Sequence, residues 1–515
     1  MKKLCLNMLT VAAAALIAAQ ASAQSTLSAS QLEPQATPDG RVLIGRGEDY
    51  VPAGVPAVDL FASLKASMPA RRDFAWDVVE KVLKPITLEV PNGPTFEVPL
   101  WLTWYEGRGR NEELRKLMEL YFVNLKAAFD SNPDADIEPI VDATLQQFAQ
   151  KDIAATLDDE TFDTVLNQNA VVQNLDELTG RGTTIFSPSF IRHMMLQAKG
   201  VMTCDLSAAR ESDAPRAPDQ FSHCIDEFPP SAVMVKTAWR DLDRGVPVHD
   251  TSAFGVARAI RLGTWPSALN GYASPPIAQP TPDEIYTVET ASGRSFALTG
   301  IHFVTKDVRE WVWVSLWWDA DGFEDFGEDK PDVISTFNDG VWENYKMCVN
   351  SSFVEGDPAP WSRYARNMPS LAASLRATQE VILEQISDGG VANSEDLIAT
   401  FGAGLDTPMF LADAHGAWMP QHSLPTTWCS NPNIEVHGGN ARTNCIGCHQ
   451  VAFTQNERRG NRETSFIDAI TGDIPQYGRA QVRRNFPAEF SWSFGFEYRS
   501  AMLNAAALAG FEWPE

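Results

Sequence analysis

Two cysteines and a histidine in the last fifth of the chain are spaced to hold an iron cofactor. Cys445, Cys448 and His449 form a C-x-x-C-H pattern within residues 444–450. Residues three apart on a helical turn lie on one face, so both thiols can form thioethers with the vinyl groups of one haem. The adjacent imidazole can then bind the iron as the proximal ligand. The pattern predicts one covalently attached haem, bound by these three residues, with His449 as the metal ligand.

Two other chemistries compete for these residues, a redox-active dithiol and half of a zinc site. A zinc site needs a second pair of ligands, and no further C-x-x-C or H-x-x-x-H follows the motif. In Cys445, Cys448 and His449 the sequence resembles the c-type cytochromes, position for position. The resemblance implies one haem c, attached outside the cytoplasm, and electron transfer as the activity.

The sixth iron position would decide between electron transfer and catalysis. A methionine or histidine there makes a carrier, whereas an open position lets peroxide, oxygen or another small ligand bind. Small c-type cytochromes supply a methionine from downstream of the motif, and here only Met502 follows it. Upstream candidates are Met409, His415, Met419, His422 and His437. The sequence leaves the choice among these residues and an open iron undecided.

The first residues of the chain have the composition of an export signal. A basic start at Lys2 and Lys3 precedes an apolar run, and Ala21-Ser22-Ala23 is a small-residue cleavage site. The run is too short to span a bilayer, and no later segment is apolar for long enough to do so. We expect residues 1–23 to be removed and the mature protein to be periplasmic or secreted, without a membrane-spanning helix.

Four further cysteines follow the expected cleavage site: Cys204, Cys224, Cys348 and Cys429. An even number in an oxidising compartment predicts disulfide bonds. Several pairings are possible. We favour Cys204–Cys224, which would close a loop rich in proline, serine and aspartate. We also favour Cys348–Cys429, which would tie the haem region to the rest of the protein.

The charge of the chain restricts its partners. The formal net charge is −26, so the surface should repel nucleic acid and anionic membranes. A basic redox partner protein would be attracted to such a surface. The alternative is that the acidic residues serve solubility alone.

The chain is much longer than one haem requires. It has 515 residues, with 15 Trp and 27 Phe, whereas a single domain of about 100 residues can enclose a haem. Helical periodicity at 73–83 and 111–129, together with hairpin patterns at 86–100 and 284–305, predicts an α+β fold. We expect a large mixed body of helices and β-sheet at 24–400. A mainly helical c-type haem region should follow at 401–515.

Residues 311–318 carry the densest aromatic pattern in the body. The order Trp-Val-Trp-Val-Ser-Leu-Trp-Trp predicts a central strand, apolar on both faces. Alternation places Trp311, Trp313 and Trp317 on one side and Val312, Val314, Leu316 and Trp318 on the other. These tryptophans are either core residues or the wall of a substrate or haem pocket. The carboxylates at 319–329 are predicted to form a solvated acidic loop.

A second resemblance involves residues 235–240, 300–307 and 311–313. These segments are similar to those of a group of large exported proteins with one terminal C-x-x-C-H and no agreed function. The resemblance implies one architecture over most of the mature chain. Electron transfer is the expected activity. The alternative is a haem-dependent oxidoreductase, peroxidase- or oxygenase-like, with an open iron and a substrate pocket lined by the aromatic segments 101–105 or 311–318.

Overall fold

The fold is known from a computed structural model of the chain. It describes residues 27–32, 42–89, 95–107, 113–157, 183–203, 226–251, 275–309, 311–323, 325–351, 429–434 and 496–513, with Asp159, Phe162 and Cys445. Helices and strands are both present, which confirms the predicted α+β class. The expected export signal lies outside the described residues. So does most of 401–515, and the helical haem region therefore remains a prediction.

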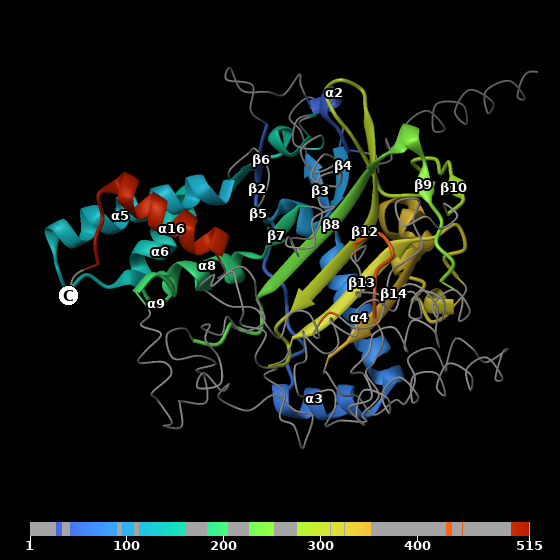
Figure 1. The fold of residues 1–515 in the computed structure, drawn as a ribbon, viewed down its shortest axis with the longest axis horizontal. Coiled ribbons are helices and arrows are strands. Elements are labelled where there is room, and N and C mark those ends of the chain that lie inside the picture. Colours follow the sequence, from blue (N-terminus) through green and yellow to red (C-terminus); the bar gives the residue numbers. More distant parts are fainter. Residues whose placement is uncertain are drawn as a thin grey trace, which may run out of the picture.

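A large, mainly antiparallel sheet forms the centre of the body (Figure 1). Its main path runs β1 (Leu27–Ser28), β11 (Thr287–Glu289), β12 (Ser295–Thr305), β8 (Val233–Asp241), β7 (Thr184–Phe186) and β5 (Tyr105–Glu106). Beside β12, the chain adds β13 (Val312–Trp318) and then β14 (Tyr345–Asn350). Only the β1–β11 pair is parallel among the pairs of this sheet. The predicted hairpin at 284–305 is confirmed as β11–β12.

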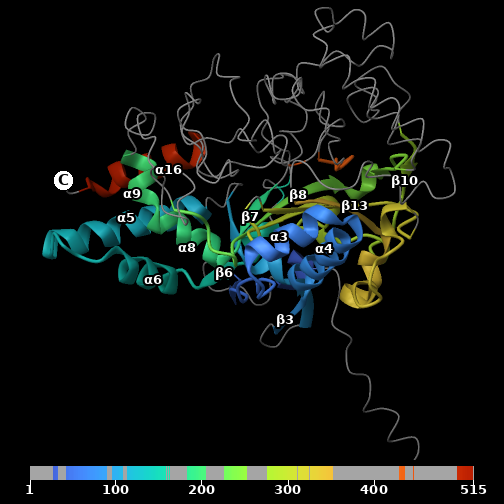
Figure 2. The ribbon, with the colours of Figure 1, turned by 90° about the horizontal axis from the view of Figure 1, so that it is seen from below.

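The two faces of this sheet differ in chemistry because side chains alternate along each strand. One face is apolar, and in one row Phe303 pairs with Val235 and Val314. Helices α3 (Ala57–Ala66) and α4 (Met68–Leu83) lie on this side (Figure 2). The next row, on the other face, is polar: His302 pairs with Lys236 and Ser315.

Strand β13 confirms the prediction for the tryptophan-rich segment. It lies between β12 and β14, and its residues are all buried. Val312, Val314, Leu316 and Trp318 belong to the apolar core on the α4 side, whereas Trp311 and Trp313 belong to a second core. Trp317, on the same side as Trp313, packs against Phe326. The strand therefore separates two cores.

A helical lobe extends from one end of the sheet (Figure 1). We use this name for α5 (Glu113–Ser131), α6 (Ile137–Gln147), α8 (Pro188–Leu196), α9 (Ala198–Thr203) and α16 (Phe496–Ala509). Helix α5 buries Leu114, Leu117, Met118, Tyr121, Phe122 and Leu125, which recur with helical spacing on one face. Helix α8 begins as its sequence indicates, because the Ser187 side chain accepts a hydrogen bond from the Phe190 amide.

Smaller elements complete the body. The predicted hairpin at 86–100 is confirmed as β3 (Pro85–Glu89) and β4 (Thr95–Pro99). Two further antiparallel pairs are β2 (Leu43–Gly45) with β6 (Gln150–Asp152), and β9 (Val246–Pro247) with β10 (Ile277–Ala278). The remaining short helices are α2 (Ala29–Leu32), η2 (Leu100–Thr103), η3 (Ala154–Leu157), η4 (Leu242–Arg244), η6 (Asp325–Gly327) and η7 (Ile334–Asn344).

Candidate functional site

Cys445 is the member of the C-x-x-C-H motif that the structure describes. It is helical and half-buried, and it packs against the hydrophobic core of the helical lobe. Cys448 and His449 lie outside the described residues, so the second thioether and the iron ligand remain predictions. The structure thus places the first cysteine of the motif beside the lobe.

The core against which Cys445 packs contains several methionines. We call it the lobe core, and its methionines are Met118, Met194, Met195, Met234 and Met502. Helices α5 and α8 are held together here, because the Tyr121 hydroxyl donates a hydrogen bond of 2.8 Å to the Met195 carbonyl oxygen. Thioether sulfur is a soft, polarisable group that packs well in apolar surroundings and can bind haem iron. The lobe core therefore supplies an apolar surface against which a haem could pack. It also supplies sulfur atoms that could bind the haem iron.

Met502 is the candidate sixth ligand whose place the structure gives. It lies in α16, is 1 % exposed, and belongs to the lobe core. The structure therefore brings Met502 and Cys445, which are far apart in sequence, to one core. The other candidates, Met409, His415, Met419, His422 and His437, lie outside the described residues.

His193 is a buried histidine of the same lobe. Its Nε2 atom lies 3.1 Å from the Asp226 carbonyl oxygen, and the centre of its ring lies 4.3 Å from that of Phe228, with the two planes tilted by 41°. Burial lowers the pKa of His193 to about 4, so the ring is neutral at physiological pH. These contacts are those of a structural histidine.

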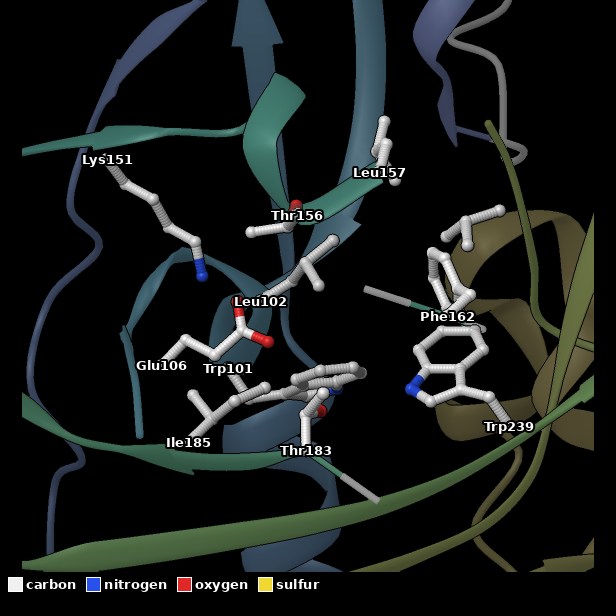
Figure 3. A pocket seen from close by; sticks show the side chains of 11 residues that line it. Trp101, Leu102, Glu106, Lys151, Thr156, Leu157, Phe162, Thr183, Ile185 and Trp239 are labelled. Atoms are coloured by element: carbon white, nitrogen blue, oxygen red, sulfur yellow. The ribbon is translucent and has the colours of Figure 1, made fainter. Parts of the chain in front are cut away.

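A small cavity lies beside the aromatic segment at 101–105 (Figure 3). Its volume is about 20 Å3. Among the described residues it is lined by Trp101, Leu102, Glu106, Lys151, Thr156, Leu157, Phe162, Thr183, Ile185, Trp239 and Val288. Glu106 and Lys151 were not singled out from the sequence. The available signal was a carboxylate directly after an aromatic run.

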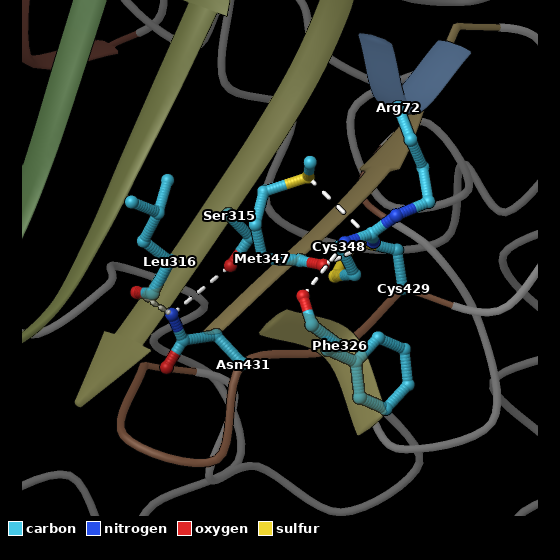
Figure 4. The surroundings of a disulfide bond; sticks show 8 residues. All are labelled: Arg72, Ser315, Leu316, Phe326, Met347, Cys348, Cys429 and Asn431. Carbon is cyan, nitrogen blue, oxygen red and sulfur yellow. Dashed lines mark hydrogen bonds between the residues drawn. A yellow bond between two sulfur atoms is a disulfide. The ribbon is translucent and has the colours of Figure 1, made fainter. Parts of the chain in front are cut away.

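The predicted Cys348–Cys429 disulfide is confirmed (Figure 4). It joins β14 to residues 429–434. The side-chain amide of Asn431 then donates hydrogen bonds to Ser315 Oγ at 3.0 Å and to the Leu316 carbonyl oxygen at 2.7 Å. The segment that precedes the motif is thereby fixed to the sheet. Cys204 and Cys224 lie outside the described residues.

Residues 429–434 lie directly on the polar face of the sheet. A Cβ atom added at Gly300 of β12 would come within 2.9 Å of the Asn431 side-chain oxygen, closer than real Cβ contacts. The Asn433 side-chain amide donates a hydrogen bond of 3.0 Å to the Thr299 carbonyl oxygen. A larger residue at position 300 would therefore push against the Asn431 side chain, and glycine favours the close approach of this segment.

The prediction of a solvated acidic loop at 319–329 is wrong for two carboxylates. Asp319 is buried and forms an ion pair with Lys346, the Nζ and Oδ2 atoms being 3.2 Å apart. Asp329 lies 2.6 Å from the Arg72 guanidinium (Figure 4 shows Arg72). Both basic partners are themselves almost fully buried. The carboxylates are drawn inward because a buried cation needs a counter-charge.

The tryptophans of 311–318 are core residues rather than the wall of a pocket, since all four are at most 4 % exposed. Within the described residues, no group of three or more histidine, cysteine, aspartate or glutamate side chains could hold a metal ion. The same part of the chain contains no helix long and apolar enough to cross a membrane. Comparisons with protein-family models, curated proteins and solved structures gave no match to the chain.

Proposed function

We propose that the protein is an exported single-haem electron carrier. The haem is bound through thioethers to Cys445 and Cys448, with His449 as the proximal ligand. The observation that carries this proposal is the C-x-x-C-H spacing. The half-buried position of Cys445 against an apolar core supports it, because a haem macrocycle needs apolar surroundings.

The residues around Cys445 fit a haem. The lobe core supplies apolar contacts and buried thioether sulfurs. When bound, the haem would supply a one-electron couple between ferric and ferrous iron. The lobe core would exclude water from the bound haem, and Met502 would be a candidate iron ligand.

The anchor at 429–434 supports a fixed haem position. The disulfide and the Asn431 hydrogen bonds hold the segment just before the motif on the sheet. A rigid attachment keeps the distance between donor and acceptor constant when a partner docks. The net charge of −26 favours a basic redox partner. The same negative charge disfavours binding to nucleic acid.

The alternative is a haem-dependent oxidoreductase with an open iron. It needs a substrate pocket, and the two aromatic segments expected to line one supply little space. Residues 311–318 are packed in cores, and the cavity beside Trp101 measures about 20 Å3, which is the space of a single water. The described residues therefore favour the carrier.

Two measurements on the purified, exported protein test the proposal. Haem absorbance should stay with the polypeptide during extraction into acidified organic solvent, since thioethers survive this treatment. Release of the haem into the solvent would rule out its covalent attachment to the chain. The ferrous spectrum should then be low-spin and unchanged by carbon monoxide. Rapid binding of the gas would overturn the carrier and favour the oxidoreductase.

A further inference from the structure

The cavity beside Trp101 is built around a buried acid and a buried base. Glu106, in β5, is 5 % exposed, and Lys151, in β6, is 1 % exposed. Both side chains extend into the space beside the Trp101 ring (Figure 3). The other walls are mostly apolar and include Leu102, Phe162 and Ile185. A charged pair in such surroundings is costly unless its hydrogen bonds are completed.

Most polar groups of the cavity wall already have partners. Lys151 Nζ donates to the Trp104 carbonyl oxygen at 2.9 Å. Trp239 Nε1 donates to Thr237 Oγ1 at 2.9 Å, and Thr183 Oγ1 lies 2.7 Å from the same hydroxyl. These bonds leave other N–H groups of the Lys151 ammonium able to donate hydrogen bonds.

One polar group of the wall lacks a partner among the described residues. Trp101 Nε1 is buried and donates to no acceptor. The Glu106 carboxylate borders the same space, and its backbone amide donates to Glu113 Oε2 at 2.7 Å. Trp101, Glu106 and Lys151 therefore border the same small space with a donor, a carboxylate and the remaining ammonium protons. This is the requirement for an ordered water, which typically makes about three hydrogen bonds.

The size of the cavity fits one water. Its volume of about 20 Å3 exceeds the roughly 10–15 Å3 that a single water needs. A second heavy atom would have to displace a wall residue. A hydroxyl-bearing substrate is therefore excluded by volume in this conformation.

The charges around Glu106 favour proton exchange. Burial raises the pKa of Glu106 to about 7, with the Lys151 charge acting against the rise and Glu113 adding to it. Burial also lowers the pKa of Lys151. Glu113 in turn pairs with Arg46, whose guanidinium lies 3.7 Å from the centre of the Tyr105 ring. The acid and the base are thus brought closer in proton affinity than they are in water.

We propose that the cavity is a binding site for one water, which joins the Glu106 carboxyl to Trp101 Nε1–H and Lys151 Nζ and passes a proton between Glu106 and Lys151. The proton leaves the carboxyl oxygen of Glu106 for the water, and the water gives one of its own protons to the neutral Lys151 amine. The water is regenerated, and the neutral pair becomes an ion pair. This site is independent of the haem proposal, because Cys445 packs against a different core.

The test uses the full-length protein labelled with 15N-tryptophan and 13C-glutamate. Trp101 Nε1–H should show a direct magnetisation-transfer signal with a long-lived water. The Glu106 carboxyl carbon and Trp101 Nε1–H should shift with a common midpoint near pH 7. Trp101→Phe assigns the indole signal. If the Trp101→Phe variant does not fold, the Trp101 indole signal is assigned instead through the backbone resonances of the wild-type protein.

Glu106→Gln keeps the side-chain shape and removes the titration, so the Trp101 shift should become independent of pH. Glu80→Gln, at an exposed position of α4, is the matched control and should leave the shift unchanged. The proposal is overturned if Trp101 Nε1–H shows no water signal. It is also overturned if the Trp101 shift stays flat while Glu106 titrates, or if Glu106 titrates near its ordinary value.

Discussion

Ser315 and Cys348 lie opposite one another on β13 and β14, and both hold the segment that precedes the haem motif. Cys348 does so through its disulfide with Cys429, and Ser315 through the hydrogen bond from Asn431. A covalent bond and a buried hydrogen bond thus meet in one row of the sheet. The row links the body to the region where the motif lies.

Removal of the disulfide should destabilise the protein strongly. Cys348 and Cys429 are 81 residues apart, and closing a loop of that length restricts the unfolded chain by about 4 kcal/mol. The double variant Cys348→Ala, Cys429→Ala should lose a comparable free energy of unfolding in urea. Peptide mapping without reduction checks the bond itself. Alkylation of either cysteine in the unreduced, folded protein would contradict it.

Replacement of Met502 separates a ligand from a core residue. Met502→Leu preserves side-chain volume, so stability should change by less than about 1.5 kcal/mol. If Met502 is the sixth ligand, the ferrous protein should now bind carbon monoxide, because leucine cannot bind iron. Met118→Leu, in the same core, is the matched control and should not bind the gas. An unchanged spectrum in Met502→Leu would remove Met502 from the candidates.

Glu106 should make stability depend on pH in a defined direction. Burial raises its pKa to about 7 from 4.5, so the folded protein holds this proton more tightly than the unfolded chain. The contribution is complete below about pH 4.5, falls as pH rises to about 7, and is constant above that. Across this window, Glu106→Gln should gain on the order of 3 kcal/mol relative to the wild type.

Unfolding in urea at a series of pH values measures this effect. The control Glu80→Gln should follow the wild type throughout, since Glu80 is exposed. If the free energy of unfolding changed with pH in the same way for the wild type and for Glu106→Gln, Glu106 would titrate alike in the folded and unfolded states.

The ion pair of Arg72 and Asp329 should be important for stability. The Arg72 guanidinium is 1 % exposed and also donates hydrogen bonds to the carbonyl oxygens of Met347 and Phe326. Asp329→Asn would leave this buried cation without its counter-charge, at a cost of roughly 3–5 kcal/mol. Asp130→Asn breaks the exposed pair with Lys126 and should cost less than about 1 kcal/mol. Equal losses of the free energy of unfolding in the two variants would argue against a special role for Asp329.

Local patterns in the sequence predicted the elements well. Alternation in 311–318 assigned Val314 and Trp313 to opposite faces, and the structure places them in different cores. Ser187 and Pro188 marked the start of α8. These features depend on neighbours in the chain, and periodicity and capping report such neighbours directly.

Contacts between distant residues could not be predicted in this way. Asp329 is drawn inward by Arg72, which lies 257 positions away in the sequence, and no local pattern reports a contact over that distance. The presence of Glu106 and Lys151 at one cavity depends equally on two strands meeting there. Of the proposed haem site, the motif came from spacing alone, whereas the place of Cys445 beside the lobe core required the fold.

The order of the helical lobe in the sequence has a consequence for biosynthesis. Helix α5 precedes the motif and α16 follows it, yet the two helices pack together in the lobe core beside Cys445. A chain that emerges from its amino end exposes Cys445 before α16 can cover that core. Attachment machinery would meet an accessible thiol during this interval. We expect a nascent chain arrested before Phe496 to react at Cys445 with a thiol reagent faster than the completed chain does.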